Sequence, residues 1–313
     1  MRVTAIAGGI GAGKFLRGLV RAVRPLDVTA IVNTGDDVRM HGLHVCPDLD
    51  SVTYWLGDAM DRERGWGRLD ETFRATGELR SFDPQAAWFN LGDLDLATHL
   101  FRTRLLSEGV PLSGVAARVA ARFGVRAQIL PMTDDPVTTR VVVSADGAEL
   151  DLHFQEYWVK RRAEDEVKAI RYEGADRARP APGVLEAIAG ADALVICPSN
   201  PIASVFPILA VPGIRDALAE RRERVVGVSP IVGGAPLAGM ADRLMPVAGF
   251  EVTAVGAARC YGALIAGWVI DERDRVLTPR TEALGLRVAV TDTIMTDDAV
   301  SEALARVALG LVA

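Results

Sequence analysis

Short apolar runs alternate with amphipathic stretches along most of this chain. The runs 3–7, 28–32, 193–197, 225–228 and 287–290 are apolar and partly β-branched, which is typical of buried strands. The stretches 16–23, 94–108, 112–123, 181–189 and 299–311 are predicted helices. Strands that alternate with helices indicate an α/β fold with a doubly wound, mostly parallel, Rossmann-like sheet.

The middle of the chain departs from this alternation. Residues 58–85 are polar, and residues 138–143 and 150–154 alternate like two strands around a hairpin turn at 145–147. We therefore expect a nucleotide-binding α/β core formed by 1–57 and 181–313. A helical and β-hairpin insertion, 58–180, is expected to contribute to a second-substrate site.

A glycine-rich stretch, GGIGAGK at residues 8–14, follows the first predicted strand. Glycines let the backbone approach a ligand closely, and a helix N-terminus directs free N–H groups at an anion. The stretch lacks the hydroxyl of a P-loop, because Phe15 follows Lys14, and Lys14 stands where a Rossmann fingerprint has its third glycine. A tight packing turn would also use small residues, but the lysine after so many glycines favours phosphate binding by Gly9, Gly11, Gly13 and Lys14.

Polar loops follow four of the predicted strands, at 8–14, 33–37, 198–201 and 229–234. In a doubly wound sheet these loops meet at one crevice. Carboxylates close to a phosphate loop suggest a Mg²⁺ site, and the candidates are Asp36, Asp37, Asp48 and Asp50. Helix capping next to Ser51 is the alternative explanation for Asp48 or Asp50.

Two further polar segments are candidate binding elements. Ser199 and Asn200 stand between two prolines, with Ser204 one helical turn beyond, and this rigid segment favours ligand binding over a simple β-turn. Trp88 and Asn90 lie near two acids and could stack a flat heteroaromatic ring, although for the aromatics alone core packing is the better explanation. No histidine spacing or nucleophile motif indicates other chemistry.

Composition narrows the class of protein. The 313 residues are 50% hydrophobic and 24% charged, with a formal net charge of −6 and no basic cluster, so we expect no nucleic-acid partner. Three widely separated cysteines indicate a reducing, cytoplasmic location. The chain has neither a signal-peptide pattern nor an apolar run of about 18 residues, so we expect no membrane partner.

The motifs, taken in order, resemble a known family. GGIGAGK, VNTGDD, VCPDLDSV, LGDLDLATHL, LPMTDDPVTT, HFQEYWV, PSNP and VSPIVGGAPLAGMA are similar to the 2-phospho-L-lactate transferase family of coenzyme F420 biosynthesis, including its actinobacterial phosphoenolpyruvate-using members. The resemblance implies transfer of a phospho-three-carbon acid from its guanosine diphosphate-activated form to a hydroxyl of the deazaflavin Fo, with release of GMP. It also implies Mg²⁺ as cofactor and a homodimer.

The resemblance further implies roles for individual residues. Mg²⁺ would be held by Asp36, Asp48 and Asp50, with Asp50 and Asp36 catalytic and Asp50 also near the Fo hydroxyl. The diphosphate would lie on Gly9, Gly11, Gly13 and Lys14, the guanosine on Ser199, Asn200 and Ser204, and the deazaflavin against Trp88 and Asn90. Leu94 stands where the family usually has an arginine, and Arg102 or Arg104 could substitute for it.

Two other functions compete with the transferase. A non-enzymatic nucleotide- or nucleotide-sugar-binding regulator of the gluconeogenesis-factor type would share the fold, and Leu94 is the feature that favours it. A P-loop kinase or ATPase is disfavoured by Phe15. The sequence leaves open which three-carbon acid is carried, with composition favouring phosphoenolpyruvate.

Overall fold

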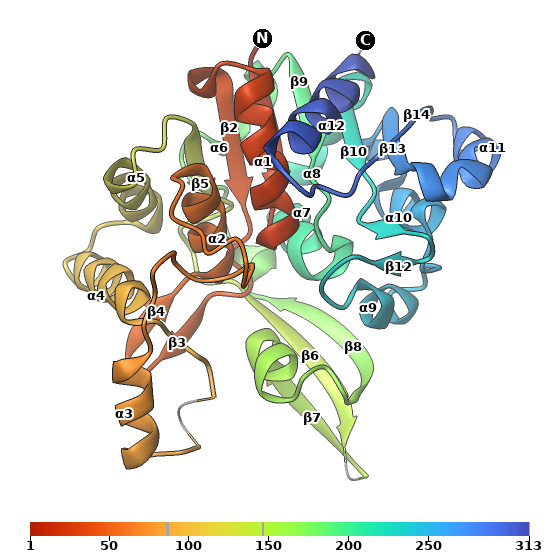
Figure 1. Ribbon diagram of the computed structural model, residues 1–313. Coiled ribbons are helices and arrows are strands. Elements are labelled where there is room, and N and C mark those ends of the chain that lie inside the picture. Colours follow the sequence, from red (N-terminus) through yellow and green to blue (C-terminus); the bar gives the residue numbers. More distant parts are fainter. Residues whose placement is uncertain (86–87, 146, 313) are drawn as a thin grey trace.

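A single parallel sheet forms the centre of the molecule in the computed structural model, which describes residues 1–85, 88–145 and 147–312. The sheet has seven strands, all parallel, shown in Figure 1. Their order across the sheet is β14 (Arg287–Thr291), β13 (Gly267–Asp271), β10 (Val225–Val228), β9 (Ala193–Ile196), β1 (Val3–Ala7), β2 (Val28–Val32) and β5 (Gln128–Pro131).

The direction of winding reverses next to the first strand. From β1 the chain passes to β2 and β5 on one side, and it later returns to β9, on the other side of β1, before continuing to β10, β13 and β14. This reversal is a topological switch point, and ligands of open α/β sheets bind there, beyond the carboxyl ends of the strands.

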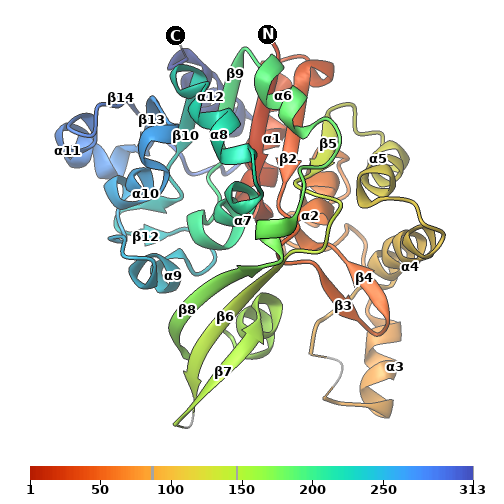
Figure 2. The same ribbon diagram turned by 180° about the vertical axis from the view of Figure 1, so that it is seen from behind.

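Helices cover both faces of the sheet, which explains why its inner strands are apolar runs without alternation. One face carries α1 (Gly9–Ala22), α2 (Pro47–Leu56), α5 (Leu112–Arg122) and α12 (Asp298–Gly310), as seen in Figure 1. The opposite face, seen in Figure 2, carries α6 (Val184–Gly190), α7 (Phe206–Ala210), α8 (Ile214–Ala219) and α10 (Ala254–Tyr261).

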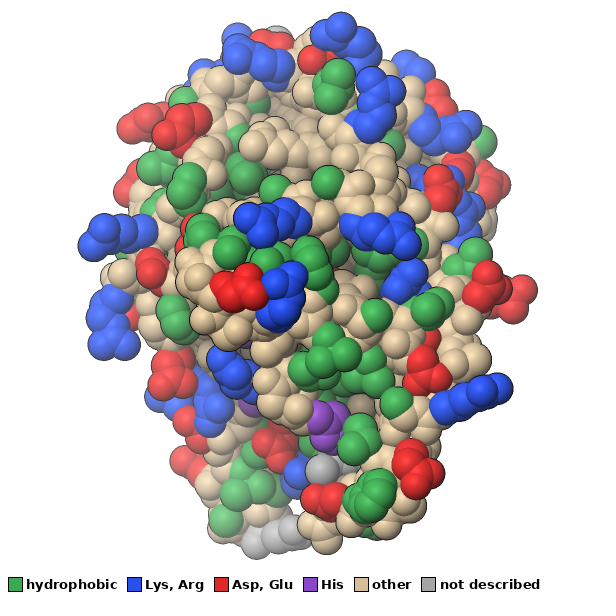
Figure 3. Space-filling model, turned by 90° about the vertical axis from the view of Figure 1, so that its left-hand side faces the viewer, with side chains coloured by type: hydrophobic (Ala, Val, Ile, Leu, Met, Phe, Trp, Pro, Cys, Tyr) green, Lys and Arg blue, Asp and Glu red, His purple; other side chains and the backbone are tan. Residues whose placement is uncertain are grey.

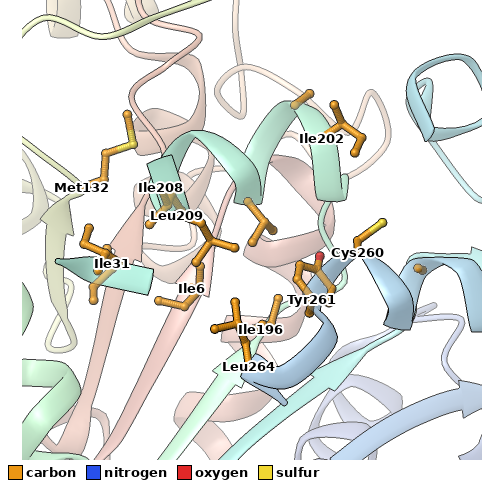
Figure 4. Packing of buried hydrophobic residues seen from close by; sticks show 14 of the residues in the cluster. Ile6, Ile31, Met132, Ile196, Ile202, Ile208, Leu209, Cys260, Tyr261 and Leu264 are labelled. Atoms are coloured by element: carbon orange, nitrogen blue, oxygen red, sulfur yellow. The ribbon is translucent and has the colours of Figure 1, made fainter. Parts of the chain in front are cut away.

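Each face has its own hydrophobic core. On α1, Ala12, Phe15, Leu16 and Leu19 are buried at helical spacing and face the sheet. On the other face, Ile6, Ile31 and Ile196 from three adjacent strands pack near Ile208 and Leu209 of α7, as Figure 4 shows.

Most of the remaining elements lie at or beyond the carboxyl edge of the sheet, at the lower part of Figure 1, whereas α11 lies beside the edge strand β14. Two antiparallel sheets extend there, one formed by β3 (Val38–Met40) and β4 (Leu43–Val45), the other by β7 (Ala148–His153), β6 (Thr138–Ala145) and β8 (Glu166–Glu173). The other elements are α3 (Arg74–Phe82), α4 (Asp93–Ser107), α9 (Ala241–Val247), α11 (Thr278–Glu282) and the short hairpin β11 (Ile231–Val232) and β12 (Ala235–Pro236).

The fold class predicted from the sequence is confirmed, with two local corrections. The first helix begins at Gly9 rather than at residue 16, so the glycine-rich stretch is largely helical. The expected insertion, 58–180, contains β5, which pairs with β2 as an edge strand of the central sheet. The predicted hairpin is present as β6 and β7, and Asp146 of its turn lies outside the described residues.

Charged side chains of both signs are interspersed on the side of the molecule shown in Figure 3. Within residues 1–85, 88–145 and 147–312, no helix combines the length and apolar character needed to cross a bilayer.

Candidate active site

The switch point brings the first glycine turn against the loop after β9. The backbone N–H of Gly8 donates a hydrogen bond to Ser199 Oγ over 3.3 Å. A Cβ added to Gly11 would overlap the carbonyl oxygen of Pro198, and one added to Gly8 would lie 2.6 Å from both Asp48 Oδ2 and Ser204 Cβ. These two glycines are therefore required by the close approach of three segments at the switch point.

Helix α1 begins in this crevice without a side-chain cap of its own, and the backbone N–H of its first residue, Gly9, donates to Asp48. Its N-cap, Gly8, has no side chain to accept a hydrogen bond, and its first turn contains no acidic residue. The first N–H groups of a helix have no partner within the helix, so an uncapped N-terminus favours an anion.

Two buried carboxylates, Asp36 and Asp48, lie beside this helix end. Asn33, directly after β2, connects them, because its Nδ2 donates to Asp48 Oδ2 over 2.9 Å and to Asp36 Oδ1 over 3.4 Å. Gln155, which follows β7, donates from Nε2 to Asp36 Oδ2 over 2.9 Å. The backbone N–H of Gly35 donates to Asn33 Oδ1 over 2.8 Å, which fixes the orientation of the amide.

Burial is the main cause of a high pKa at both carboxylates. It raises the pKa of Asp36 well above its usual range, and the charges of Asp48 and Asp37 raise it further. Burial also raises the pKa of Asp48 to about 7, against the opposing hydrogen bond from Asn33. The hydrogen bonds from Asn33 and Gln155 come from neutral amides, so a bound cation would relieve the repulsion between the two carboxylates.

The residues present at Asp36 and Asp48 fit a magnesium ion. Mg²⁺ takes one or two carboxylates together with phosphate oxygens and water. Two desolvated carboxylates with high pKa values, next to a helix end that favours phosphate, offer this donor set.

Asp50 lies in a different environment from its neighbour Asp48. Arg102 of α4, fully buried, binds both Asp50 oxygens, with Nη1 3.0 Å from Oδ2 and Nη2 in contact with Oδ1. Arg102 Nη1 also donates to Nδ1 of His99 over 3.1 Å. Because an arginine can only donate, Nδ1 of His99 accepts and the imidazole proton is on Nε2. The geometry separates Asp50 from the Asp36–Asp48 pair rather than adding it as a third ligand.

Another buried acid, Asp95 of α4, lies near Asp50 between α2 and α4. Tyr54 of α2 donates from its hydroxyl to Asp95 Oδ1 over 2.7 Å. Burial raises the pKa of Asp95 to about 7, and the charge of Asp50 raises it further. The wall between α2 and α4 is thus a buried polar network in which Arg102 provides the positive charge next to Asp50.

The loop after β9 is held mainly by its own hydrogen bonds. Asn200 Oδ1 accepts from the backbone N–H groups of Ile202, over 3.0 Å, and Ala203, over 3.1 Å. Asn200 therefore caps the short π-helical turn Pro201–Val205. Ser199 and Ser204 are both buried next to Gly8, so the structure brings these predicted residues together.

Other predicted residues lie apart from the crevice. Lys14 Nζ is 5.8 Å from the centre of the Trp55 ring, beside a hollow of about 70 Å³ between α1, α2 and α12. A Cβ added to Gly13 would overlap the Trp55 side chain, so Gly13 serves helix packing. Trp88 packs on a small cluster beside the β3–β4 hairpin, and Asn90 Oδ1 accepts from Arg80 over 3.2 Å.

Several residues of the site were not selected from the sequence. Asn33 and Gln155 lie in the VNTGDD and HFQEYWV segments, and their amides contact the carboxylates directly. The sequence indicates Arg102 only as a substitute for the arginine absent at position 94. The available signal was the amide that accompanies the acids in each motif, but nothing in the spacing indicated which side chains would meet.

The switch-point location and the site place the chain among α/β proteins that bind a ligand at the carboxyl edge of a doubly wound sheet. Comparison with known proteins gives the family. The family model described as "2-phospho-L-lactate transferase CofD" matches residues 3–306, and the chain belongs to this family. The resemblance drawn from the motifs is thereby confirmed, and the chain is a transferase by family.

Individual relatives agree with this assignment. A "Phosphoenolpyruvate transferase" of Streptomyces griseus is 51% identical over 99% of this chain and 98% of its own length. A protein of the same name from Streptomyces coelicolor is 47% identical over the same shares. A solved structure from Bacillus halodurans, 20% identical, superposes with a TM-score of 0.62 over 97% of this chain and 98% of that chain, which confirms the fold alone.

Proposed function

We propose that this protein transfers a phospho-three-carbon acid from its guanosine diphosphate-activated form to a hydroxyl of the deazaflavin Fo, releasing GMP, in coenzyme F420 biosynthesis. The observation that carries the proposal is the Asp36–Asp48 pair beside the uncapped N-terminus of α1, in a chain of this family. Phosphoryl transfer depends on charge neutralisation and in-line positioning more than on a covalent nucleophile.

Phosphoenolpyruvate is the acid that the comparisons favour. Relatives that are 51% and 47% identical over 99% of this chain are named phosphoenolpyruvate transferases. The alternative acids, phospholactate and phosphoglycerate, are distinguished by the experiment below.

In this proposal Asp36 and Asp48 hold Mg²⁺, with Asn33 and Gln155 orienting the two carboxylates. An ion bound there would supply positive charge to the diphosphate. The N–H groups at the start of α1, from Gly9 onward, bind the phosphate oxygens. Gly11 permits this by letting α1 approach the loop after β9.

Asp50 is proposed to accept the proton of the Fo hydroxyl. The hydroxyl oxygen attacks the phosphorus that carries the three-carbon acid, the bond from that phosphorus to the oxygen of GMP breaks, and GMP leaves. Each carboxylate oxygen has two lone pairs, so the two hydrogen bonds from Arg102 leave Asp50 able to accept. Arg102 is a positioning residue in this account.

The remaining assignments extend the proposal outward from the crevice. Ser199 and Ser204 lie on the guanosine side, with Asn200 shaping the loop through its cap. Trp88, which packs against the β3–β4 hairpin, and Asn90 are the proposed deazaflavin contacts. We also propose that the protein is cytoplasmic and that it forms a homodimer. Sedimentation of the purified protein would test the homodimer.

The test is a reaction of the purified protein with Fo, Mg²⁺ and each guanylylated acid in turn, analysed by mass spectrometry. We expect GMP and a phosphodiester adduct of Fo, formed most rapidly from the phosphoenolpyruvate donor. The adduct should be lost in Asp48→Asn and retained in Arg104→Met, a variant of an exposed ion pair. Guanosine nucleotide binding without an adduct from any donor would contradict the transferase and favour the regulator.

A further inference from the structure

A second cluster of potential metal ligands lies on the β3–β4 hairpin, immediately beside the carboxylate pair. It consists of Asp37, His44 and Cys46, whose ligand atoms all lie within 4.8 Å of one another. Cys46 Sγ is 2.9 Å from Asp37 Oδ2, and His44 Nε2 is 3.1 Å from the same oxygen.

The hairpin brings the three side chains together by its register. Val38 pairs with Val45 in antiparallel fashion, so Asp37 and Cys46 are opposite each other at the open end. Side chains alternate along extended backbone, so His44 and Cys46 point in the same direction. The backbone is fixed from outside as well, because His44 N–H donates to Thr103 Oγ1 over 2.8 Å.

Asp37 has an unsatisfied atom at this cluster. Its side chain is only 9% exposed, and within the described residues its Oδ1 is buried without a hydrogen-bond partner. A buried carboxylate oxygen left without a partner costs free energy. The other oxygen of the same carboxylate already contacts both Cys46 and His44, so the unpartnered atom belongs to the group at the centre of the cluster.

We propose that Asp37, His44 and Cys46 form a binding site for a thiophilic divalent metal ion of the zinc class, separate from the Asp36–Asp48 pair. Zinc takes oxygen, nitrogen and sulfur ligands at about 2.0–2.3 Å in tetrahedral geometry, which places ligand atoms about 3.3–3.5 Å apart. The present separations of 2.9 and 3.1 Å need only a small expansion to reach these values. The three side chains leave a fourth position for water or for Asp37 Oδ1.

The ligand types distinguish this site from the carboxylate pair. Thiolate and imidazole ligands favour zinc, whereas magnesium prefers oxygen ligands. The Cys46 thiol at present donates its proton to Asp37, and on metal binding this proton leaves to solvent while the sulfur binds as thiolate. His44, 25% exposed, moves its own proton to Nδ1 and binds through Nε2.

A metal ion here would fix both segments that carry the carboxylate pair. Asp37 directly follows Asp36, and Cys46 is two residues before Asp48. The site would therefore connect the loop after β2 to the start of α2, independently of whether the transfer reaction proceeds. The proposal does not depend on the identity of the substrates.

The test uses Co²⁺ as a spectroscopic probe on the full-length protein after treatment with a chelator. We expect one Co²⁺ per chain with a near-ultraviolet thiolate-to-cobalt charge-transfer band and the intense visible bands of a four-coordinate ion. Zn²⁺ should abolish these bands by displacement, and excess Mg²⁺ should leave them unchanged.

Variants assign the band to its ligands. Cys46→Ser should abolish the charge-transfer band and weaken Zn²⁺ binding by more than about tenfold, because even the loss of a hydrogen-bond partner of a metal ligand costs that much. The matched control is Cys260→Ser, because Cys260 is also a buried free thiol, but it donates to the Gly256 carbonyl within α10. If Cys46→Ser fails to fold by circular dichroism, His44→Gln, which alters a partly exposed ligand, should weaken Zn²⁺ binding in the same way.

Three results would each overturn the proposal: folded wild-type protein without a thiolate band, a band that persists in Cys46→Ser, or a band removed by Mg²⁺. The first would show that the cluster is a hydrogen-bond group only. The second and third would place the ion elsewhere in the protein.

Discussion

Two pairs of charged groups lie close together in the crevice and differ in what balances them. Asp36 and Asp48 face neutral amides, and burial raises the pKa of both. Asp50, two residues further along α2, is bound through both oxygens by the buried Arg102. Carboxylates that look equivalent in the sequence thus divide into a pair that lacks a cation and one that already has its own.

The difference separates two functions within one site. A carboxylate pair without a positive partner is suited to bind a metal ion, because the ion relieves both burial and mutual repulsion. A carboxylate already held by arginine is suited to a fixed position beside the second substrate. The following predictions test this division, from the largest expected effect to the smallest.

Arg102→Met should destabilise the protein most. It leaves Asp50 buried without its cation, and breaking a buried pair costs about 3–5 kcal/mol. Arg104→Met is the control from the same helix, since the Arg104–Glu108 pair has side chains that are 58% and 50% exposed, and should cost less than about 1 kcal/mol. Urea denaturation measures both, and equal losses would show that the Asp50–Arg102 pair is not a buried unit.

Gly11→Ala should have a smaller but clear effect. The added methyl group would overlap the Pro198 carbonyl oxygen, and forcing α1 away from the loop should cost about 1–3 kcal/mol. Gly77→Ala, in α3 with nothing within 4 Å of its added Cβ, should instead stabilise by about 0.5–1 kcal/mol. Chemical denaturation measures the change in the free energy of unfolding for both variants, and the two changes should have opposite signs. A stabilising Gly11→Ala would contradict the close approach at the switch point.

The protonation of the Asp48 carboxylate should be visible in the pH dependence of the protein's stability. The pKa of this carboxylate is about 7 in the folded protein against the ordinary value of 3.8 for an aspartate, so the folded state binds more protons between these two pH values. The contribution of this group to the free energy of unfolding is therefore largest below about pH 4, and it decreases as the pH rises toward about 7. Asp48→Asn should remove this part of the slope.

The measurement is thermal unfolding across pH in a chelator and again with Mg²⁺, which should offset the decrease in wild-type protein. Asp27→Asn is the control, because Asp27 is a partly exposed acid outside the crevice whose pKa is lowered by its hydrogen bond from Arg24. A slope unchanged in Asp48→Asn would show that this carboxylate does not titrate as described.

Lys14→Met should have the smallest effect. Lys14 lies over the face of Trp55 rather than in the crevice, and such a contact contributes about 0.5–1 kcal/mol. We expect the rate of Fo adduct formation to change by less than about fivefold, which is the equivalent of 1 kcal/mol. A much larger loss of rate would indicate that Lys14 binds the diphosphate, as the glycine motif alone suggests.

The sequence was sufficient for the fold class and for the meeting of the first glycine turn with the loop after β9. Apolar runs such as 28–32 became central strands because a parallel sheet buries both faces. The strand β13, GWVID, was not singled out, and β5 had been placed in the insertion. Both are short, and only pairing with distant strands assigns them to the sheet.

The grouping of the aspartates could not be taken from their proximity in sequence. Asp48 and Asp50 both lie in the first turn of α2, where residues two apart point about 200° from each other. Asp48 consequently faces Asn33 and Asp50 faces Arg102. That Arg102 would meet Asp50 depends on the packing of α4, which local sequence does not encode.

The most direct test of this division is the affinity of the protein for Mn²⁺, a paramagnetic substitute for Mg²⁺, measured by electron paramagnetic resonance. We predict that Asp48→Asn weakens binding by at least about tenfold, whereas folded Asp50→Asn remains within about threefold of wild type. Strong loss in Asp50→Asn with unchanged affinity in Asp48→Asn would contradict the account, because it would make Asp50 the metal ligand and Asp48 a bystander.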